Sequence, residues 1–105
     1  MIELPKIEIM AEMSVNGETY KERTLGEYWY EKIKYERLHR MIIKREAGTI
    51  DFTPNCPMEQ WKAQASAMGQ YLYQLEIKAE IEGFDLDDVF YTKFRGEQSR
   101  NETVS

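Results

Sequence analysis

The chain has 105 residues, 31% of them charged, and 19 acidic against 14 basic side chains give it a net charge of −5. This length fits one domain with a modest core, and the acidic balance argues against general binding to nucleic acids or membrane surfaces. One cysteine and one histidine allow neither an internal disulfide nor a Cys/His zinc site within one chain. We therefore expect a cytoplasmic protein with no cofactor, no metal site and no membrane-spanning segment.

The first predicted element is a β-hairpin over residues 6–23. Every second residue from Ile7 to Val15 is apolar, which is the period of a strand with one covered face. Asn16-Gly17 then favours a type I′ turn, and residues 18–23 would form the returning strand. Because a two-stranded ribbon is marginal in water on its own, this hairpin needs a helix or another subunit beneath it.

A helical hairpin over residues 25–82 is predicted next. Thr24 and Glu27 have the spacing of a capping box, and Gly48 suits the end of a helix, so the first helix should lie between them. Its apolar residues fall on two faces. We therefore expect this helix to contact two neighbours, either within the chain or in another subunit.

The second helix is predicted between Pro57 and Gly83. Its main apolar stripe follows steps of three and four residues and consists of Trp61, Ala65, Met68, Leu72, Leu75 and Ala79. The opposite face carries small, amide and apolar side chains, which are Ala63, Ala67, Gln70, Gln74, Ile77 and Ile81. The two faces of this helix, taken together with the two faces of the β-hairpin, favour a homo-oligomer, and an irregular monomeric core is the competing interpretation.

The end of the chain is less regular. Residues 84–94 fit a short capped helix or a strand equally well, and the polar composition of residues 96–105 predicts a flexible tail. The predicted fold class is therefore α+β, with an N-terminal β-hairpin followed by an antiparallel two-helix hairpin. Residues 1–95 would form a single domain, expected to assemble as a homo-oligomer.

The sequence contains few residues in patterns typical of catalytic or metal sites. Asp85 and Asp87 begin like a calcium loop, but Val89 takes the third ligand position and the turn glycine is absent. His39 sits in a charged helix, and Cys56 lies beside prolines with nothing to depress the pKa of its thiol. We expect no catalytic residue and no metal ligand, which makes an enzyme the least favoured class.

A family resemblance comes from the second helix. The pattern Q-x-x-A-M-x-x-Y-L-x-x-L-x-x-K runs from Gln64 to Lys78, where arginine is usual in place of the lysine. It resembles the second helix of the hairpin in phage anti-CBASS and anti-Thoeris sponges, which is also found in crAss-like phage proteins. The resemblance covers about residues 35–82, and it implies a phage protein that acts in the host cytoplasm as a homo-oligomer. It also implies stoichiometric binding of a cyclic dinucleotide, a cyclic trinucleotide or a cyclic ADP-ribose isomer, without cleavage.

Ligand-binding residues can be selected by their chemistry alone. Guanidinium and ammonium groups pair with phosphates, and aromatic rings stack on bases. The first helix interleaves basic and aromatic residues, although an ordinary solvated helix explains the same spacing. The candidates are Arg37, Arg40, Lys44, Arg45, Tyr28, Trp29 and Tyr71.

Two other functions remain open. The chain could be an acidic inhibitor, similar to an anti-CRISPR protein, that binds a protein of a bacterial defence system. The carboxylates for such a surface are Glu76, Glu80, Glu82, Asp85, Asp87 and Asp88. It could also be a phage assembly or accessory module whose helical hairpin serves only to join subunits.

Overall fold

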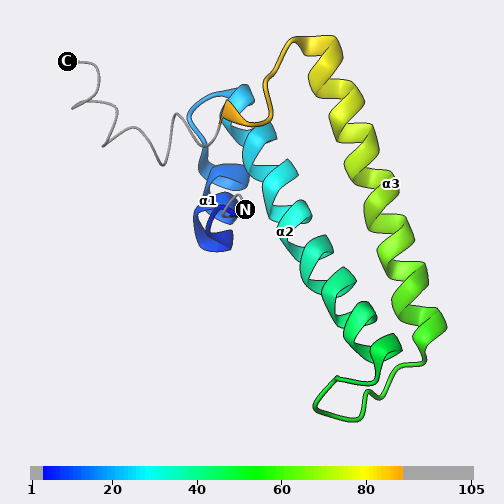
Figure 1. Ribbon diagram of the computed structural model, residues 1–105. Helices are drawn as coiled ribbons and strands as arrows, with labels where there is room; N and C mark the ends of the chain where they lie inside the picture. Colours follow the sequence, from blue (N-terminus) through cyan, green and yellow to red (C-terminus); the bar gives the residue numbers. More distant parts are fainter. Residues whose placement is uncertain (1–3, 89–105) are drawn as a thin grey trace, which may run out of the picture.

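The computed structural model describes residues 4–88. It contains three helices, α1 (Ile7–Asn16), α2 (Tyr20–Ala47) and α3 (Met58–Glu82). Helices α2 and α3 form a long antiparallel hairpin, and α1 lies beside the N-terminal half of α2 (Figure 1). Over residues 4–88 there is no strand, so the described part of the chain is all-helical.

The predicted N-terminal β-hairpin is wrong, and with it the α+β class. Met10 and Met13, which a strand would place on opposite faces, are both buried on one side of α1, at 0% and 2% exposed. Gly17 has a φ of −57°, whereas a type I′ turn needs positive φ at both central residues. Glutamate, methionine and alanine favour helix in this segment, and helical spacing lets both methionines reach α2.

Helix α2 begins earlier than predicted because the sequence contains two capping-box patterns. The structure uses the first, in which the Thr19 hydroxyl accepts a hydrogen bond of 3.0 Å from the Glu22 N–H. The Glu22 carboxylate accepts one of 2.9 Å from the Glu18 N–H. Thr24, the predicted cap, is buried within the helix. The two glycine C-caps are confirmed, since Gly48 and Gly83 have φ of 79° and 76°.

Helix α2 lies between the other two helices. Gly26 approaches α1 at Met13 and Ser14, whereas Tyr35 approaches α3 at Gly69. Nine residues separate Gly26 from Tyr35, which is two and a half helical turns and places them on opposite faces. The two neighbours expected for this helix are therefore both elements of the same chain.

The hydrophobic core lies along the N-terminal half of α2, between this helix and its two neighbours α1 and α3. It consists of Met10, Met13, Leu25, Tyr28, Trp29, Ile33, Leu72 and Leu75. At the other end of the hairpin, polar and ring contacts hold α2 to α3. The Arg45 guanidinium lies 4.8 Å from the Trp61 ring centre, and Lys62 pairs with Glu46 at 2.7 Å.

The structure describes only the first part of the predicted C-terminal segment, as far as residue 88. Residues 84–88 form turns that close over α2 and α3, with the Asp87 N–H donating to the Asp85 carboxylate at 3.0 Å. The rest of the predicted element over 84–94, and the predicted tail over 96–105, lie outside the described residues. No helix within residues 4–88 is long and apolar enough to cross a membrane.

Two glycines in α2 and α3 provide a matched test of this packing. A Cβ on Gly26 would lie 2.5 Å from the Ser14 backbone nitrogen, whereas a Cβ on Gly69 would meet Tyr35 at an ordinary 3.6 Å. We expect Gly26→Ala to destabilise the fold by about 1–3 kcal/mol through overpacking. We expect Gly69→Ala to stabilise it by about 1 kcal/mol through helix propensity. Urea unfolding followed by circular dichroism measures both, and equal effects would contradict the close α1–α2 contact.

Candidate functional site

A groove lies between the N-terminal end of α1 and the middle of α2. Its volume is about 740 Å³, and it is called here the basic groove. It is lined by Leu4, Pro5, Lys6, Ile7, Glu8, Ile9, Ile33, Glu36, Arg37 and Arg40. Three cations and two carboxylates thus line the groove together with apolar side chains. Two of the seven predicted ligand-binding residues, Arg37 and Arg40, lie together here.

The short length of α1 produces this groove. Counted from Gly26, residues Ile33, Arg37, Arg40 and Lys44 are close to two, three, four and five helical turns away, so they share one face of α2. Helix α1 covers the start of this face, where Gly26 and Ile33 are buried. Beyond the end of α1 the same face continues as exposed basic side chains. One face of α2 is therefore buried as far as Ile33 and exposed and basic from Arg37 to Lys44, a part called here the basic stripe.

The charges in the basic groove are available to an anion. Arg37 and Arg40 are exposed, and no residue within 4–88 forms a hydrogen bond or ion pair with either of them. Glu36 is instead paired with Lys32 at 3.7 Å. No side chain caps the N-terminus of α1 at Lys6, so the positive end of the helix dipole adds to the two guanidinium groups.

The other two predicted cations, Lys44 and Arg45, lie on different faces of α2. Lys44 is exposed on the same face as Arg40, one turn further along. Arg45 points toward α3, where it donates to the Cys56 carbonyl at 2.8 Å and stacks on Trp61. Arg45 therefore joins the two arms of the hairpin, away from the basic groove.

The predicted aromatic residues do not lie with the arginines of the basic groove. Tyr28 and Trp29 are buried at 5% and 8% exposed, with their rings packed edge to face at 5.3 Å. The Tyr28 hydroxyl donates to Glu76 at 2.7 Å, and the Trp29 indole N–H donates to the Leu86 carbonyl at 2.6 Å. Tyr71 is 41% exposed on α3, and its hydroxyl donates to the Glu27 carboxylate.

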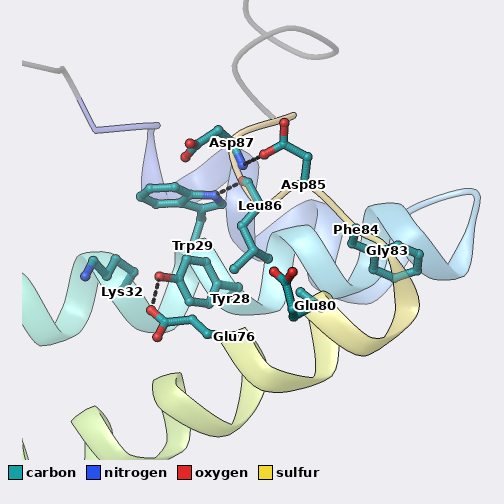
Figure 2. A pocket seen from close by; sticks show the side chains of 11 residues that line it. Tyr28, Trp29, Lys32, Glu76, Glu80, Gly83, Phe84, Asp85, Leu86 and Asp87 are labelled. Atoms are coloured by element: carbon teal, nitrogen blue, oxygen red, sulfur yellow. Dashed lines mark hydrogen bonds between the residues drawn. The ribbon is translucent and has the colours of Figure 1, made fainter.

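A second groove of about 740 Å³ lies between α2, α3 and residues 83–87, and it is called here the acidic groove (Figure 2). Tyr28 and Trp29 form part of its wall, with Leu86 beside them. Its charged lining residues are Lys32, Glu76, Glu80, Asp85 and Asp87. Four carboxylates against one ammonium repel a phosphate, so an anionic ligand is favoured in the basic groove and disfavoured here.

Two tyrosines in and near the acidic groove have perturbed acidities. Burial, together with the hydrogen bond to Glu76, raises the pKa of Tyr28 well above its ordinary value. The hydrogen bond to Glu27, assisted by burial, raises the pKa of Tyr71 to about 12. Both phenols therefore remain protonated donors at neutral pH, each holding a carboxylate of the neighbouring helix.

Sequence reasoning missed Lys6 and the α1 side of the basic groove. Lys6 immediately precedes α1, and the predicted β-hairpin over residues 6–23 does not place it beside Arg37. The usable signal was Met10 and Met13, which are spaced for one face of a helix. Among residues 4–88 no cluster of side chains suits a metal ion.

Comparison with known proteins decides the family. The Sequestin family model matches residues 18–81, which include all of α2 and nearly all of α3. The chain belongs to the Sequestin family. Sequestins are the cyclic-nucleotide sponges among phage anti-defence proteins, a binding family rather than an enzyme family, so the predicted resemblance is confirmed. No curated protein and no solved structure matches the chain.

Family membership supports a sequestering role in phage anti-defence. The match covers the whole basic stripe of this Sequestin, from Arg37 to Lys44. It does not cover α1 or Lys6, which form the other wall of the basic groove. The groove therefore combines a matched helix with a segment outside the match.

Ionisation of the tyrosines tests the α2–α3 contacts. Because the folded-state pKa of Tyr28 lies above the unfolded value of about 10, its stabilising contribution is complete below pH 10 and is lost as the pH rises toward the folded-state pKa. We expect ultraviolet absorbance of tyrosinate to show Tyr28 ionising later in the folded protein than after denaturation. Tyr28→Phe should reduce this late component and leave the part that belongs to Tyr71, whose pKa is also raised, to about 12. A folded-state titration identical to the denatured one would contradict the buried hydrogen bond.

Proposed function

We propose that this Sequestin binds and sequesters a cyclic nucleotide immune signal without cleaving it. The signal would be a cyclic dinucleotide, a cyclic trinucleotide or a cyclic ADP-ribose isomer, bound in the host cytoplasm by a homo-oligomer. Family membership supports this role, and one observation supports its location. Arg37 and Arg40 stand unpaired over an apolar floor, at the positive end of α1.

The chemistry of the basic groove fits the two parts of a nucleotide. Guanidinium forks of Arg37 and Arg40 can each donate two hydrogen bonds to a phosphate, and Lys44 extends the positive face by one turn. Leu4 and Ile7 offer an apolar surface for a base or ribose. Tyr28 and Trp29 instead pack within the core, so in this proposal they shape the fold rather than stack on the ligand.

The mechanism in this proposal is mass action. A cyclic signal bound by the sponge is removed from the free pool, so the effector that it would activate stays off. Capture must be stoichiometric, because each molecule of signal occupies a site until it dissociates. This requires high affinity rather than turnover, and unpaired arginines supply affinity without any nucleophile or general base.

Ligand binding can be tested with a matched set of arginine variants. A ligand at about 100 times its dissociation constant should stabilise the protein by roughly 2.7 kcal/mol, visible as a thermal shift in a panel of the three signal classes. Arg37→Gln and Arg40→Gln should each weaken binding about tenfold or more, because each removes charge-assisted hydrogen bonds. Arg45→Gln is the control, since Arg45 faces Trp61 and not the groove. Isothermal titration calorimetry measures all three.

Several results would overturn this proposal. One is the absence of a thermal shift with every signal class. Another is a loss of affinity in Arg45→Gln equal to that in Arg37→Gln, which would move the site to the far end of the hairpin. Recovery of a cleaved ligand after denaturation, detected by mass spectrometry, would show an enzyme instead of a sponge.

The acidic groove favours a second candidate function, inhibition of a defence protein that presents basic side chains. Its carboxylates at Glu76, Glu80, Asp85 and Asp87 would face that partner. Neutralising Glu80, Asp85 and Asp87 together should then abolish protein capture, while the thermal shift panel stays silent. A phage assembly or accessory module predicts neither effect.

A further inference from the structure

No helix within residues 4–88 packs on the face of α3 that points away from α2, because α2 is the only helix there that contacts α3 (Figure 1). We call this face the outer stripe. It consists of Ala63, Ala67, Gln70, Gln74, Ile77 and Ile81, all of them exposed. Ile81 is 79% exposed, and Tyr73 beside the stripe is 61% exposed. Large apolar side chains on a bare helix face indicate a binding surface when they are contiguous.

The spacing of the outer stripe indicates what kind of surface covers it. Its residues follow one another at steps of four and three, which is the a/d repeat of a coiled coil. None of the six is charged, although 31% of the chain is charged. An uncharged a/d seam is suited to another helix with the same repeat.

The order of residues along the stripe makes it complementary to itself in one direction. It runs from small residues through amides to large apolar residues. When a second copy of α3 lies antiparallel, Ala63 faces Ile81 of the second copy and Ala67 faces Ile77 of the second copy. Gln70 then faces Gln74, and two amides can donate and accept hydrogen bonds with each other. A parallel pair would instead place alanine on alanine at one end and isoleucine on isoleucine at the other.

Charge favours the same direction. The C-terminal end of α3 is acidic at Glu76, Glu80 and Glu82. A parallel pair would bring two such ends together, whereas an antiparallel pair separates them. An antiparallel pair also opposes the two helix dipoles.

We infer that two copies of this chain associate through the outer stripes of α3, packed antiparallel about a two-fold axis near the level of Leu72. The inference rests on the homo-oligomer of the proposed function and not on its ligand. The basic groove lies on the opposite face of α2 and stays open in this pair.

Cysteine cross-linking tests both the face and the direction. In a Cys56→Ser background, Ala63→Cys/Ile81→Cys should form a disulfide-linked dimer, because these positions face each other in the antiparallel pair. Ala63→Cys alone is the control. In that pair the two copies of residue 63 are 18 residues apart along the axis, about 27 Å at 1.5 Å per residue, so the single variant should stay unlinked. Non-reducing electrophoresis measures both outcomes.

Sedimentation equilibrium tests the packing without any cross-link. Ile81→Glu should raise the dimer dissociation constant about 100-fold or more, because it buries a charge in two symmetric layers. Val15→Glu, at an equally exposed apolar residue of α1, should leave it unchanged. Ala67→Ile should weaken the dimer, and Ala67→Ile/Ile77→Ala should restore it, since only the antiparallel pair regains small-against-large layers.

The possible results divide cleanly. A monomer at all concentrations, a cross-link through Ala63→Cys alone, or a stronger dimer in Ala67→Ile would overturn the inference. Calorimetry with the cyclic signals is an independent readout. Absence of self-association in the unmodified protein, together with normal ligand binding, would reject this interface and leave the sponge intact. A dimer of the unmodified protein that binds none of the cyclic signals would reject the sponge alone.

Discussion

The structure depends on the packing of two helices against opposite faces of α2. Gly26 lets the backbone of α1 approach one face, and Tyr28 and Trp29 fasten the other side through hydrogen bonds to Glu76 and Leu86. Because α1 and α3 contact α2 but not each other, neither has another helix as a partner within residues 4–88. The positions of both grooves therefore depend on α2, which borders each of them.

This arrangement separates charge. Both grooves border α2 and have equal volume, but one is lined by Lys6, Arg37 and Arg40 and the other mainly by carboxylates. A net charge of −5 would by itself repel an anionic signal. In the proposed site, Arg37 and Arg40 lie unpaired by any residue within 4–88 at the uncapped end of α1, where the helix dipole adds to their positive charge. The carboxylates of the acidic groove would instead suit a cationic group.

The sequence was informative where several signals agreed, and misleading where one pattern served two structures. The α2–α3 hairpin follows from long 3.6-residue periodicity and from Gly48 and Gly83, and the family resemblance lies within it. The apolar residues between 7 and 16 fit the two-residue period of a strand, but Met10 and Met13 also fit one face of a helix. The structure has the helix, which packs closely against Gly26, and this contact cannot be seen in the sequence. The arginines could be selected from the sequence by charge. The burial of Tyr28 and Trp29 could not, because aromatic rings serve cores and binding sites alike.

The basic groove is a composite of two different kinds of segment. Its arginine wall lies on α2, inside the residues that match the Sequestin family, whereas α1 and Lys6 lie outside the match. Extending α1 by two turns would cover Arg37 and Arg40 and close the groove, and deleting α1 would expose Ile33 and remove the helix dipole. The length of this ten-residue helix therefore determines whether the basic stripe of α2 is exposed or buried. The residues inside the family match contribute Arg37 and Arg40, and α1, outside the match, forms the opposite wall of the groove.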